Sequence, residues 1–363
     1  MIFPTDYGAI LDRIQKIDPI GYGNTRNYVD GDVTYLSPYI SRGVISTKEI
    51  LGSTLNRGFS PKSIEKFIQE LVWREYWQEV WWAKGTLINH DLKSKQDNVR
   101  FSGIPNAIND GKTNIKAIDE GLHNLYETGY IHNHIRMYTA SVTCNIGQYH
   151  WLTPAKWMYY HLLDGDWASN ALSWQWVAGT NSNKKYIANQ ENVNRFCNTN
   201  QQKTFLDVDY KTLGNMECPI VLQESIEPVL KTNLPKTSPL KIDSTLPTLI
   251  YTSYNLDPNW LNDVTANRIL LLEPSHFDQY PISDKVLVFV LNLSKNIPNI
   301  QIHVGEFNEL IEANNIENVH FKRHPFSTHF KGTAYNYDKI FNVSGYHSSF
   351  FRYWNKGKKT VQW

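Results

Sequence analysis

The hydrophobic pattern of this 363-residue chain changes once, and the change limits how the chain can fold. Up to about residue 212 apolar residues recur with a helical period, as in IEKFIQELVWREYWQEVWWA at 64–83, because positions three or four apart share one face of a helix. Strand patterns are scarce there, which predicts an all-α domain over 1–212. From 213 to 247 prolines interrupt a stretch with little periodicity, and this predicts a linker.

Residues 248–363 alternate short apolar runs with helical segments. The runs TLIYTSYN, RILLLEP, IQIHVG and VHFKRH are typical of buried strands, and DKVLVFVLNLSKNI and FNELIEANN are typical of helices. Alternating strands and helices indicate an α/β unit with a parallel sheet. The sequence therefore predicts a multidomain protein, in which a smaller, Rossmann-like α/β domain over 248–363 follows the all-α domain and the linker.

Composition narrows the class of protein. Lys and Arg number 36 against 35 Asp and Glu, a formal net charge of +1, so no overall charge attracts nucleic acid, although a local basic face is compatible with this balance. Three widely spaced cysteines, Cys144, Cys197 and Cys218, do not make a disulfide framework and indicate a reducing compartment. The opening MIFPTDYGAILDR lacks the basic start of a signal peptide, and no apolar run reaches the length of a membrane span. We expect a soluble, cytoplasmic protein.

Residues 161–180, HLLDGDWASNALSWQWVAGT, place carboxylates, an amide and three tryptophans within a few helical turns. Asp166 and Asn170 are four residues apart and share one face of a helix. The alternative is that Asp164 or Ser169 caps the helix and that the tryptophans fill a core. That alternative does not explain why so many polar groups stand among rings that should be buried.

Two other helical segments carry chemical groups at a matched spacing. Glu70, Trp73 and Arg74 are spaced i, i+3, i+4, which puts a carboxylate, an indole and a guanidinium on one helical face. A surface Glu/Arg pair beside a half-buried tryptophan is the simpler alternative for this set. The same spacing recurs in HNHIRM, at Asn133, Arg136 and Met137. Two helices with such faces can line one cavity from opposite sides.

Other chemistries fit less well. His132 and His134 are two residues apart and diverge on a helix, so a zinc pair is not expected. GKT at 111–113 is similar to the end of a phosphate loop, but Asn106 stands where that loop requires glycine. The chain contains neither a G-x-S-x-G nor a C-x-x-C motif. We expect no metal site.

Four blocks of the chain resemble, in the right order, the flavin-binding half of the photolyase/cryptochrome family. They are TRNYVDGDVTYLSPYISRGVIS (25–46), QELVWREYW (69–77), GKTN through ETGYIHNHIRMYTAS (111–141) and HLLDGDWASNALSWQWVAGT (161–180). The resemblance covers roughly 1–222, and it implies an FAD-binding domain that holds its cofactor in a bent shape.

The resemblance also implies which residues bind FAD. The hydroxyls of Thr34 and Ser37 and the guanidinium of Arg74 would hold the diphosphate, for which such donors are suited. Asp166 would face the polar edge of the isoalloxazine, and Asn170 would lie at its N5, where an amide tolerates added negative charge better than a carboxylate does. The remaining cofactor positions are Asn133 and an Arg–Asp pair beside the ring, Arg136 and Asp164.

On the substrate side the residues match the class of photolyases that repairs cyclobutane dimers better than the (6-4) class. Glu70 would hydrogen-bond the carbonyl edge of the dimer, while Trp73 and Trp176 would stack on the flipped-out lesion. Asn133 and Met137 stand where dimer photolyases have them. The implied activity is that of a deoxyribodipyrimidine photolyase acting on damaged DNA. Under light, reduced FAD passes an electron to the dimer, the ring opens, and the electron returns.

Some positions depart from the family. Tyr35 and His134 stand where many members have arginine, and both changes remove positive charge that would hold a DNA phosphate. These changes favour lost or altered repair. The alternative function is therefore a cryptochrome-like FAD blue-light photoreceptor that signals through a partner, and a flavoprotein that retains only the fold is a third option.

The tryptophan relay that photoreduces the flavin in this family is incomplete here. Trp174 and Trp151 match its inner and middle members, whereas the outer position falls on Phe101. Phenylalanine is far harder to oxidise than tryptophan. Either another ring, such as Trp167 or a nearby tyrosine, completes the path, or photoreduction is slow.

The order of the domains differs from that of photolyases, which normally begin with an α/β antenna domain. Residues 248–363 weakly resemble such a domain, which predicts a permuted order with an antenna-like domain placed C-terminally. An unrelated α/β module is the alternative. The resemblance leaves the antenna pigment open, and we expect a monomer.

Overall fold

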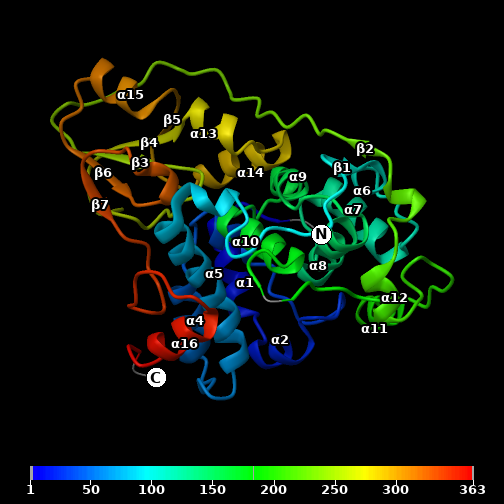
Figure 1. Cartoon of the computed structure of the whole chain (residues 1–363). Helices are drawn as coiled ribbons and strands as arrows, with labels where there is room; N and C mark the ends of the chain where they lie inside the picture. The colour runs from blue at the N-terminus through cyan, green and yellow to red at the C-terminus, as the bar shows by residue number, and fades with distance from the viewer. Residues whose placement is uncertain (1–2, 183, 362–363) are drawn as a thin grey trace. The chain divides into compact units, whose positions relative to one another are not determined.

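The computed structural model describes residues 3–182 and 184–361. Its described part divides into two compact units, which we treat separately (Figure 1). The sheet unit contains residues 3–19, 34–76 and 231–361, and the helical unit contains residues 20–33, 77–182 and 184–230. The predicted boundaries 1–212, 213–247 and 248–363 follow the chain instead and stay a prediction.

Five parallel strands form the sheet, in the order β5-β4-β3-β6-β7 (Figure 1). A parallel sheet is thereby confirmed for the α/β region, and four of its strands coincide with the four predicted runs. β7 has no counterpart among those runs, because it is short and mostly exposed and so lacks an apolar pattern. The strands are β3 (Thr248–Tyr251), β4 (Asn267–Leu272), β5 (Ile300–Val304), β6 (Val319–Lys322) and β7 (Thr333–Tyr335).

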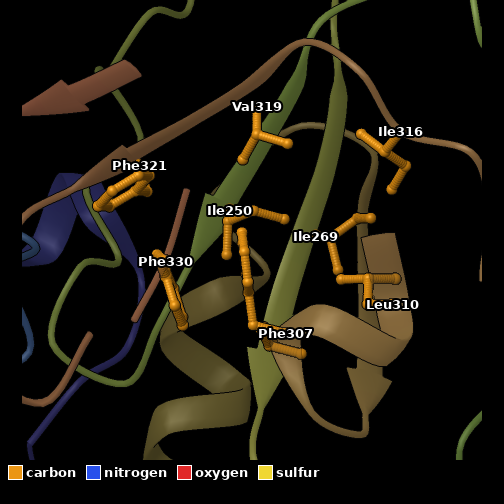
Figure 2. Close-up of a cluster of buried hydrophobic side chains, with 9 residues drawn as sticks. Ile250, Ile269, Phe307, Leu310, Ile316, Val319, Phe321 and Phe330 are labelled. Atoms are coloured by element: carbon orange, nitrogen blue, oxygen red, sulfur yellow. The ribbon is translucent and has the colours of Figure 1, made fainter. Parts of the chain in front are cut away.

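A hydrophobic cluster lies between the central strands and α15 (Phe307–Ala313) (Figure 2). Side chains alternate along a strand, so residues two apart, such as Ile269 and Leu271 of β4, enter this cluster together. The residues between them are buried as well, as expected for a parallel sheet covered on both faces. The cluster consists of Ile250, Ile269, Leu271, Phe307, Leu310, Ile316, Val319, Phe321 and Phe330.

Some helices of the sheet unit begin with side-chain caps. Ser46 and Glu49 form a capping box at the start of α4, and Ser283 caps α14. α5 matches the predicted helix at 64–83 and runs from the sheet unit into the helical unit. The helices are α1 (Tyr7–Gln15), α3 (Ser37–Ser41), α4 (Thr47–Asn56), α5 (Glu65–Lys84), α13 (Pro274–Gln279), α14 (Asp284–Ser294), α15, η4 (Pro325–Ser327) and α16 (Phe350–Gly357).

Glu75 lies on α5 inside the sheet unit, with 4% of its surface exposed. Its carboxylate accepts hydrogen bonds from Thr47 Oγ1 (2.6 Å), Ile340 N (2.7 Å) and Phe341 N (3.3 Å). Burial raises the pKa of the Glu75 carboxyl to about 7, because the cost of desolvating the charged form outweighs these bonds. Glu75 thereby ties a C-terminal segment to α4 and α5.

We expect Glu75→Gln to change how stability depends on pH. The folded-state pKa lies above the ordinary value of 4.5, so the contribution of this carboxyl is full below pH 4.5 and is lost as pH rises through about 7. Relative to wild type, the variant should gain about 3 kcal/mol in the free energy of unfolding over that range. Urea unfolding at several pH values measures the gain, with Glu65→Gln at the exposed start of α5 as control. Parallel curves for wild type and Glu75→Gln would contradict the prediction.

Part of the predicted linker follows the edge of the sheet. Residues 227–243 have no regular secondary structure. The backbone N–H of Lys241 donates to Gln301 Oε1 (2.7 Å), and its carbonyl accepts from Gln301 Nε2 (2.8 Å). Val304 N donates to Thr237 Oγ1 (3.2 Å). These bonds attach the segment to β5, an edge strand.

The helical unit is built from helices and one small pairing of strands. β1 (Ile104–Pro105) pairs antiparallel with β2 (Ser225–Ile226), so the region is mainly but not entirely helical. Among residues 3–182 and 184–361, none of the helices has the length and apolar character needed to cross a bilayer. The helices are α2 (Pro19–Thr25), η1 (Gly85–Asn89), α6 (Asn106–Asn109), α7 (Lys116–Thr128), α8 (Asn133–Ser141), η2 (Val142–Ile146), α9 (Leu152–His161), α10 (Trp167–Ala178), α11 (Gln190–Cys197), α12 (Tyr210–Asn215) and η3 (Ile220–Leu222).

The helix that carries HNHIRM is regular only in its first part. After Ser141 it widens into the π-helical turn η2, in which Gly147 N donates to Val142 O (2.7 Å). Thr139 and Thr143 both hydrogen-bond with their hydroxyls to the carbonyl four residues earlier. Such bonds compete with the backbone ladder and bend helices, which explains the change of pitch.

Candidate functional site

Helices α8, α9 and α10 of the helical unit enclose a cavity of about 100 Å³. Asn133, Arg136 and Met137 reach it from α8, and Asn170 and Trp174 reach it from α10, because residues three or four apart share a helix face. The structure thus brings the predicted residues of HNHIRM together with those of 161–180. The cavity is completed by Ala140, Met158, Leu162, Asp164, Asp166, Ser169, Ser173 and Val177.

Arg136 and Asp164 form a largely buried ion pair at this cavity. Nη2 of Arg136 lies 3.1 Å from Oδ1 and 2.8 Å from Oδ2 of Asp164. The side chains are 21% and 5% exposed, respectively. Arg136 Nε also donates to Ile131 O (2.9 Å), and its guanidinium lies over the ring of Tyr130. The Arg136 guanidinium is therefore held in one orientation by the ion pair with Asp164, the hydrogen bond to Ile131 O and the ring of Tyr130.

Asp166 is the N-cap of α10. Its backbone is extended and its Oδ1 accepts from Ser169 N (2.8 Å), which satisfies a backbone donor of the first turn. Gln78 Nε2 donates to the other carboxylate oxygen. The alternative that Asp164 or Ser169 caps the helix is therefore wrong, because Asp166 occupies the N-cap position of α10.

Asn170 and Ser169 present polar atoms to the cavity. Asn170 Nδ2 donates to Ala155 O (2.7 Å), which fixes the orientation of its amide. The Ser169 hydroxyl is buried and has no hydrogen-bond partner among the residues that the structure describes. A buried polar atom of this kind indicates a partner supplied by water or by a ligand.

The tryptophans of 161–180 have different environments. Trp174 lines the cavity and is 2% exposed, whereas Trp176 is 39% exposed and lies beside Tyr186. Trp167 is fully buried and donates from Nε1 to Asn89 Oδ1 (2.7 Å). Residues 161–180 therefore contribute both to a buried core and to a polar site. The interpretation as a site and the interpretation as a core each describe part of this segment.

The other predicted site residues belong to the sheet unit. Arg74 Nη1 donates to Ser41 Oγ (2.9 Å), and Thr34 Oγ1 accepts from Leu36 N (3.3 Å), two residues along the chain. Ser37 is the first residue of α3. Glu70 pairs with Lys66 (3.0 Å) one helical turn before it.

The Trp73 indole, also in the sheet unit, stacks on Phe350 of α16 with ring centroids 3.8 Å apart and 8° between the planes.

Of the two positions that depart from the family, His134 is buried and Tyr35 is half-buried. His134 is buried and stacks on Phe196, with ring centroids 4.7 Å apart. Burial lowers the pKa of the His134 ring to about 4, so the ring is uncharged at neutral pH. Tyr35 adopts a left-handed backbone with φ 53°, and its carbonyl accepts from Arg13 Nη1 (3.4 Å).

Gln78 and Ser169 contribute to the site without having been predicted to do so. Gln78 follows Arg74 by four residues on α5, so helical spacing from a predicted residue is a signal that would have found it. Ser169 stands three residues after Asp166, the spacing of an N-cap and its N3 partner. Its orphaned hydroxyl depends on packing, for which the sequence carries no signal.

The region of the chain that contains this cavity matches a known protein family. A family model described as the FAD binding domain of DNA photolyase matches residues 67–212. The deoxyribodipyrimidine photo-lyase of Agrobacterium fabrum is 30% identical over 196 residues, which are 49% of this chain and 39% of that protein. The deoxyribodipyrimidine photo-lyase of Buchnera aphidicola is 33% identical over 200 residues, which are 50% of this chain and 41% of that protein. The chain thus spans about two fifths of the length of these curated relatives.

Solved structures include a similar cryptochrome. The cryptochrome of Synechocystis is 25% identical, with a TM-score of 0.48 over 54% of this chain and 44% of that chain. The family and the FAD cofactor predicted from the sequence are confirmed by the family match. Residues 67–212, which include every residue around the cavity, belong to the family of FAD-binding domains of DNA photolyases.

Proposed function

We propose that this protein is a light-driven DNA repair flavoprotein that splits cyclobutane pyrimidine dimers by electron transfer from reduced FAD. The observation that carries the proposal is the cavity in the FAD-binding region, where Asp166, Asn170 and the Arg136–Asp164 pair stand around one space with Trp174. A fixed cation, an oriented amide and an oxidisable ring in one cavity suit a redox cofactor with a polar edge.

The residues of the cavity fit the polar edge of a flavin. The orphaned hydroxyl of Ser169 would gain a partner from a ring nitrogen or carbonyl. Arg136 offers N–H donors, and Asn170 adds no negative charge against an incoming electron. When bound, FAD supplies the one-electron chemistry, while these residues orient it and set its electrostatic surroundings. For the diphosphate we propose the hydroxyl and guanidinium donors Thr34, Ser37 and Arg74.

The proposed substrate is a pyrimidine dimer flipped out of damaged DNA. The exposed ring of Trp176 is suited to stacking on a base, a contact worth about 1–3 kcal/mol. Asn133 and Met137 line the cavity and are proposed to contact the lesion. Glu70 and Trp73 are proposed to hydrogen-bond and stack on it.

A repair assay tests this function. The FAD-loaded, chemically reduced protein is mixed with a thymine-dimer oligonucleotide and exposed to blue light. The expected result is recovery of the thymine absorbance band in the light and none in the dark. Intact dimer after illumination, with reduced FAD still bound, would overturn the repair function.

Glu70→Ala is expected to slow repair by about 100-fold while FAD stays bound, because a hydrogen bond to the charge that develops on the dimer is lost. The rate of dimer loss under constant illumination measures this, and the flavin absorbance spectrum reports cofactor content. Glu65→Ala on the same helix is the matched control. An unchanged repair rate in Glu70→Ala would show that the dimer binds elsewhere.

One observation favours the photoreceptor as a second candidate function. One ring face of Trp73 is covered by Phe350, which is 2% exposed, so the chain itself fills a place proposed for the lesion. A dimer stacking there would have to displace α16. Photoreduction of bound FAD without dimer repair in the same assay would identify the photoreceptor, which signals through a partner instead.

For the α/β region we propose an antenna-like, Rossmann-like domain in permuted order. Numbered along the chain, its strands follow the order 3-2-1-4-5, the beginning of the doubly wound arrangement that binds nucleotides. Purifying the protein from its native source and extracting small molecules under denaturing conditions tests this domain. A second chromophore besides FAD supports an antenna.

A further inference from the structure

Asp91 holds the Trp151 indole by its N–H group. Trp151 Nε1 donates to Asp91 Oδ1 at 2.7 Å, and Trp151 is fully buried. Asp91 also accepts from Gln96 N at Oδ2 (2.8 Å), and His150 Nε2 lies 3.2 Å from Oδ1. The Asp91 side chain is 18% exposed. Its carboxylate therefore accepts from the buried Trp151 indole and is also reached by solvent.

Gln96 fixes the same geometry from the backbone side. Its Oε1 accepts from Trp151 N (3.0 Å), and its Nε2 donates to Tyr149 O (2.8 Å). Gln96 is itself 4% exposed. Residues 91–96 therefore hold the main chain at 149–151 and the indole N–H together, which leaves the ring little freedom to turn away from Asp91.

The neighbouring rings that are candidates for the outer member of the relay have different hydrogen-bond partners. Trp167 donates from Nε1 to the amide oxygen of Asn89. Tyr149, which stacks on Phe101, donates from its hydroxyl to the carbonyl of Leu222 (2.9 Å). Amide and carbonyl oxygens are very weak bases, whereas the carboxylate bonded to Trp151 can take a proton. Of these three rings, Trp151 alone has a basic hydrogen-bond partner.

We propose that Asp91 is the proton acceptor of Trp151 when this indole gives up an electron, an inference that rests on the proposed flavin photochemistry. One electron passes from Trp151 to oxidised Trp174, which has itself given an electron to FAD. The Nε1 proton then moves along the 2.7 Å hydrogen bond to Asp91 Oδ1. The products are a neutral indolyl radical and a neutral carboxylic acid. A thiol from solution later returns the electron, and the proton goes back to Nε1.

This step compensates for phenylalanine at position 101. An indole radical cation is a far stronger acid than a neutral indole, so the adjacent carboxylate can take its proton. The neutral radical is a weaker oxidant than the cation, which slows the return of the electron. The relay therefore ends at Trp151, and the charge is held there without a third tryptophan.

Flash spectroscopy on the FAD-loaded protein tests the step. The absorption spectrum distinguishes the indole radical cation from the neutral indolyl radical, and the decay gives the lifetime of the separated charge. Wild type should form the neutral radical, with slower formation in D2O. In Asp91→Asn, which keeps an acceptor but loses the base, the cation should persist and the lifetime should fall by about 100-fold. Asp97→Asn is the matched control, since Asp97 is exposed in the same loop and pairs with Lys185.

The FAD-free protein allows a second measurement, which tests the hydrogen bond between Trp151 and Asp91. With ¹⁵N-tryptophan labelling, Asp91→Asn should move the indole N–H resonance of Trp151, identified by its loss in Trp151→Phe, and Asp97→Asn should leave it in place. An unmoved resonance in Asp91→Asn would overturn the hydrogen bond on which the step depends. Identical radical forms and lifetimes in wild type and Asp91→Asn would overturn the proton transfer, as would a persistent cation in wild type.

The Asp91 step and the repair function can be refuted independently of each other. If wild type forms no tryptophan radical, the relay is refuted and the Asp91 step with it. Dimer repair by chemically reduced protein needs no relay, so the repair assay still decides the proposed function in that case.

Discussion

Replacing Arg136 with methionine is expected to abolish FAD binding and to lower the free energy of unfolding of the FAD-free protein by about 3–5 kcal/mol. The substitution keeps an apolar stem of similar length but removes the cation that lies 2.8 Å from Asp164 Oδ2. Asp164 is only 5% exposed, so solvent cannot replace the lost guanidinium. Chemical denaturation and flavin titration measure the two effects independently.

The ion pair provides its own control. Combining Arg136→Met with Asp164→Asn should recover much of the stability, because no buried charge is left without its partner, but should not recover FAD binding. Arg195→Met, at an exposed arginine of α11, should change neither quantity. Wild-type FAD affinity in Arg136→Met would show that this pair does not lie beside the cofactor.

Replacing Trp174 with phenylalanine is expected to abolish photoreduction of bound FAD in air. Trp174 is the oxidisable ring that lines the cavity, and phenylalanine is far harder to oxidise than tryptophan. Illumination with blue light in the presence of an external thiol, followed by flavin absorbance, measures photoreduction. Dimer repair by chemically reduced Trp174→Phe should continue, because that reaction does not use the relay.

Trp167→Phe is the matched comparison for Trp174→Phe, since both indoles are buried on α10. Trp167 packs against Tyr159 and bonds to Asn89. We expect its replacement to lower stability and to leave photoreduction in place. Normal photoreduction in Trp174→Phe would refute the proposed path, and its loss in Trp167→Phe would put Trp167 on that path.

Features that depend on local spacing could be predicted from the sequence. Asn133, Arg136 and Met137 face the cavity together because the helical period determines which positions of one helix point the same way, whereas the packing of α8 beside α10 is not a local feature. β3 and β4 were predictable from their apolar runs, which reflect burial of the strands on both faces of the sheet.

Features that depend on distant partners could not be predicted. The stacking of Phe350 on Trp73 joins positions 277 residues apart in the chain, and no local pattern marks it. The π-helical turn at Val142–Ile146 keeps the composition of an ordinary helix, so periodicity does not reveal it. The hydrogen bond from Trp151 to Asp91 likewise joins two segments whose local patterns are unrelated.

The segment bound to Gln301 has a consequence for the behaviour of the protein in concentrated solution. An edge strand such as β5 exposes backbone groups on which a strand of another molecule can add. Here Thr237 accepts from the backbone N–H of Val304, and Lys241 bonds to the side chain of Gln301. Pro235 and Pro239 cannot extend a ladder, since proline has no N–H to donate. We therefore expect this segment to hinder the addition of a strand from another molecule at β5.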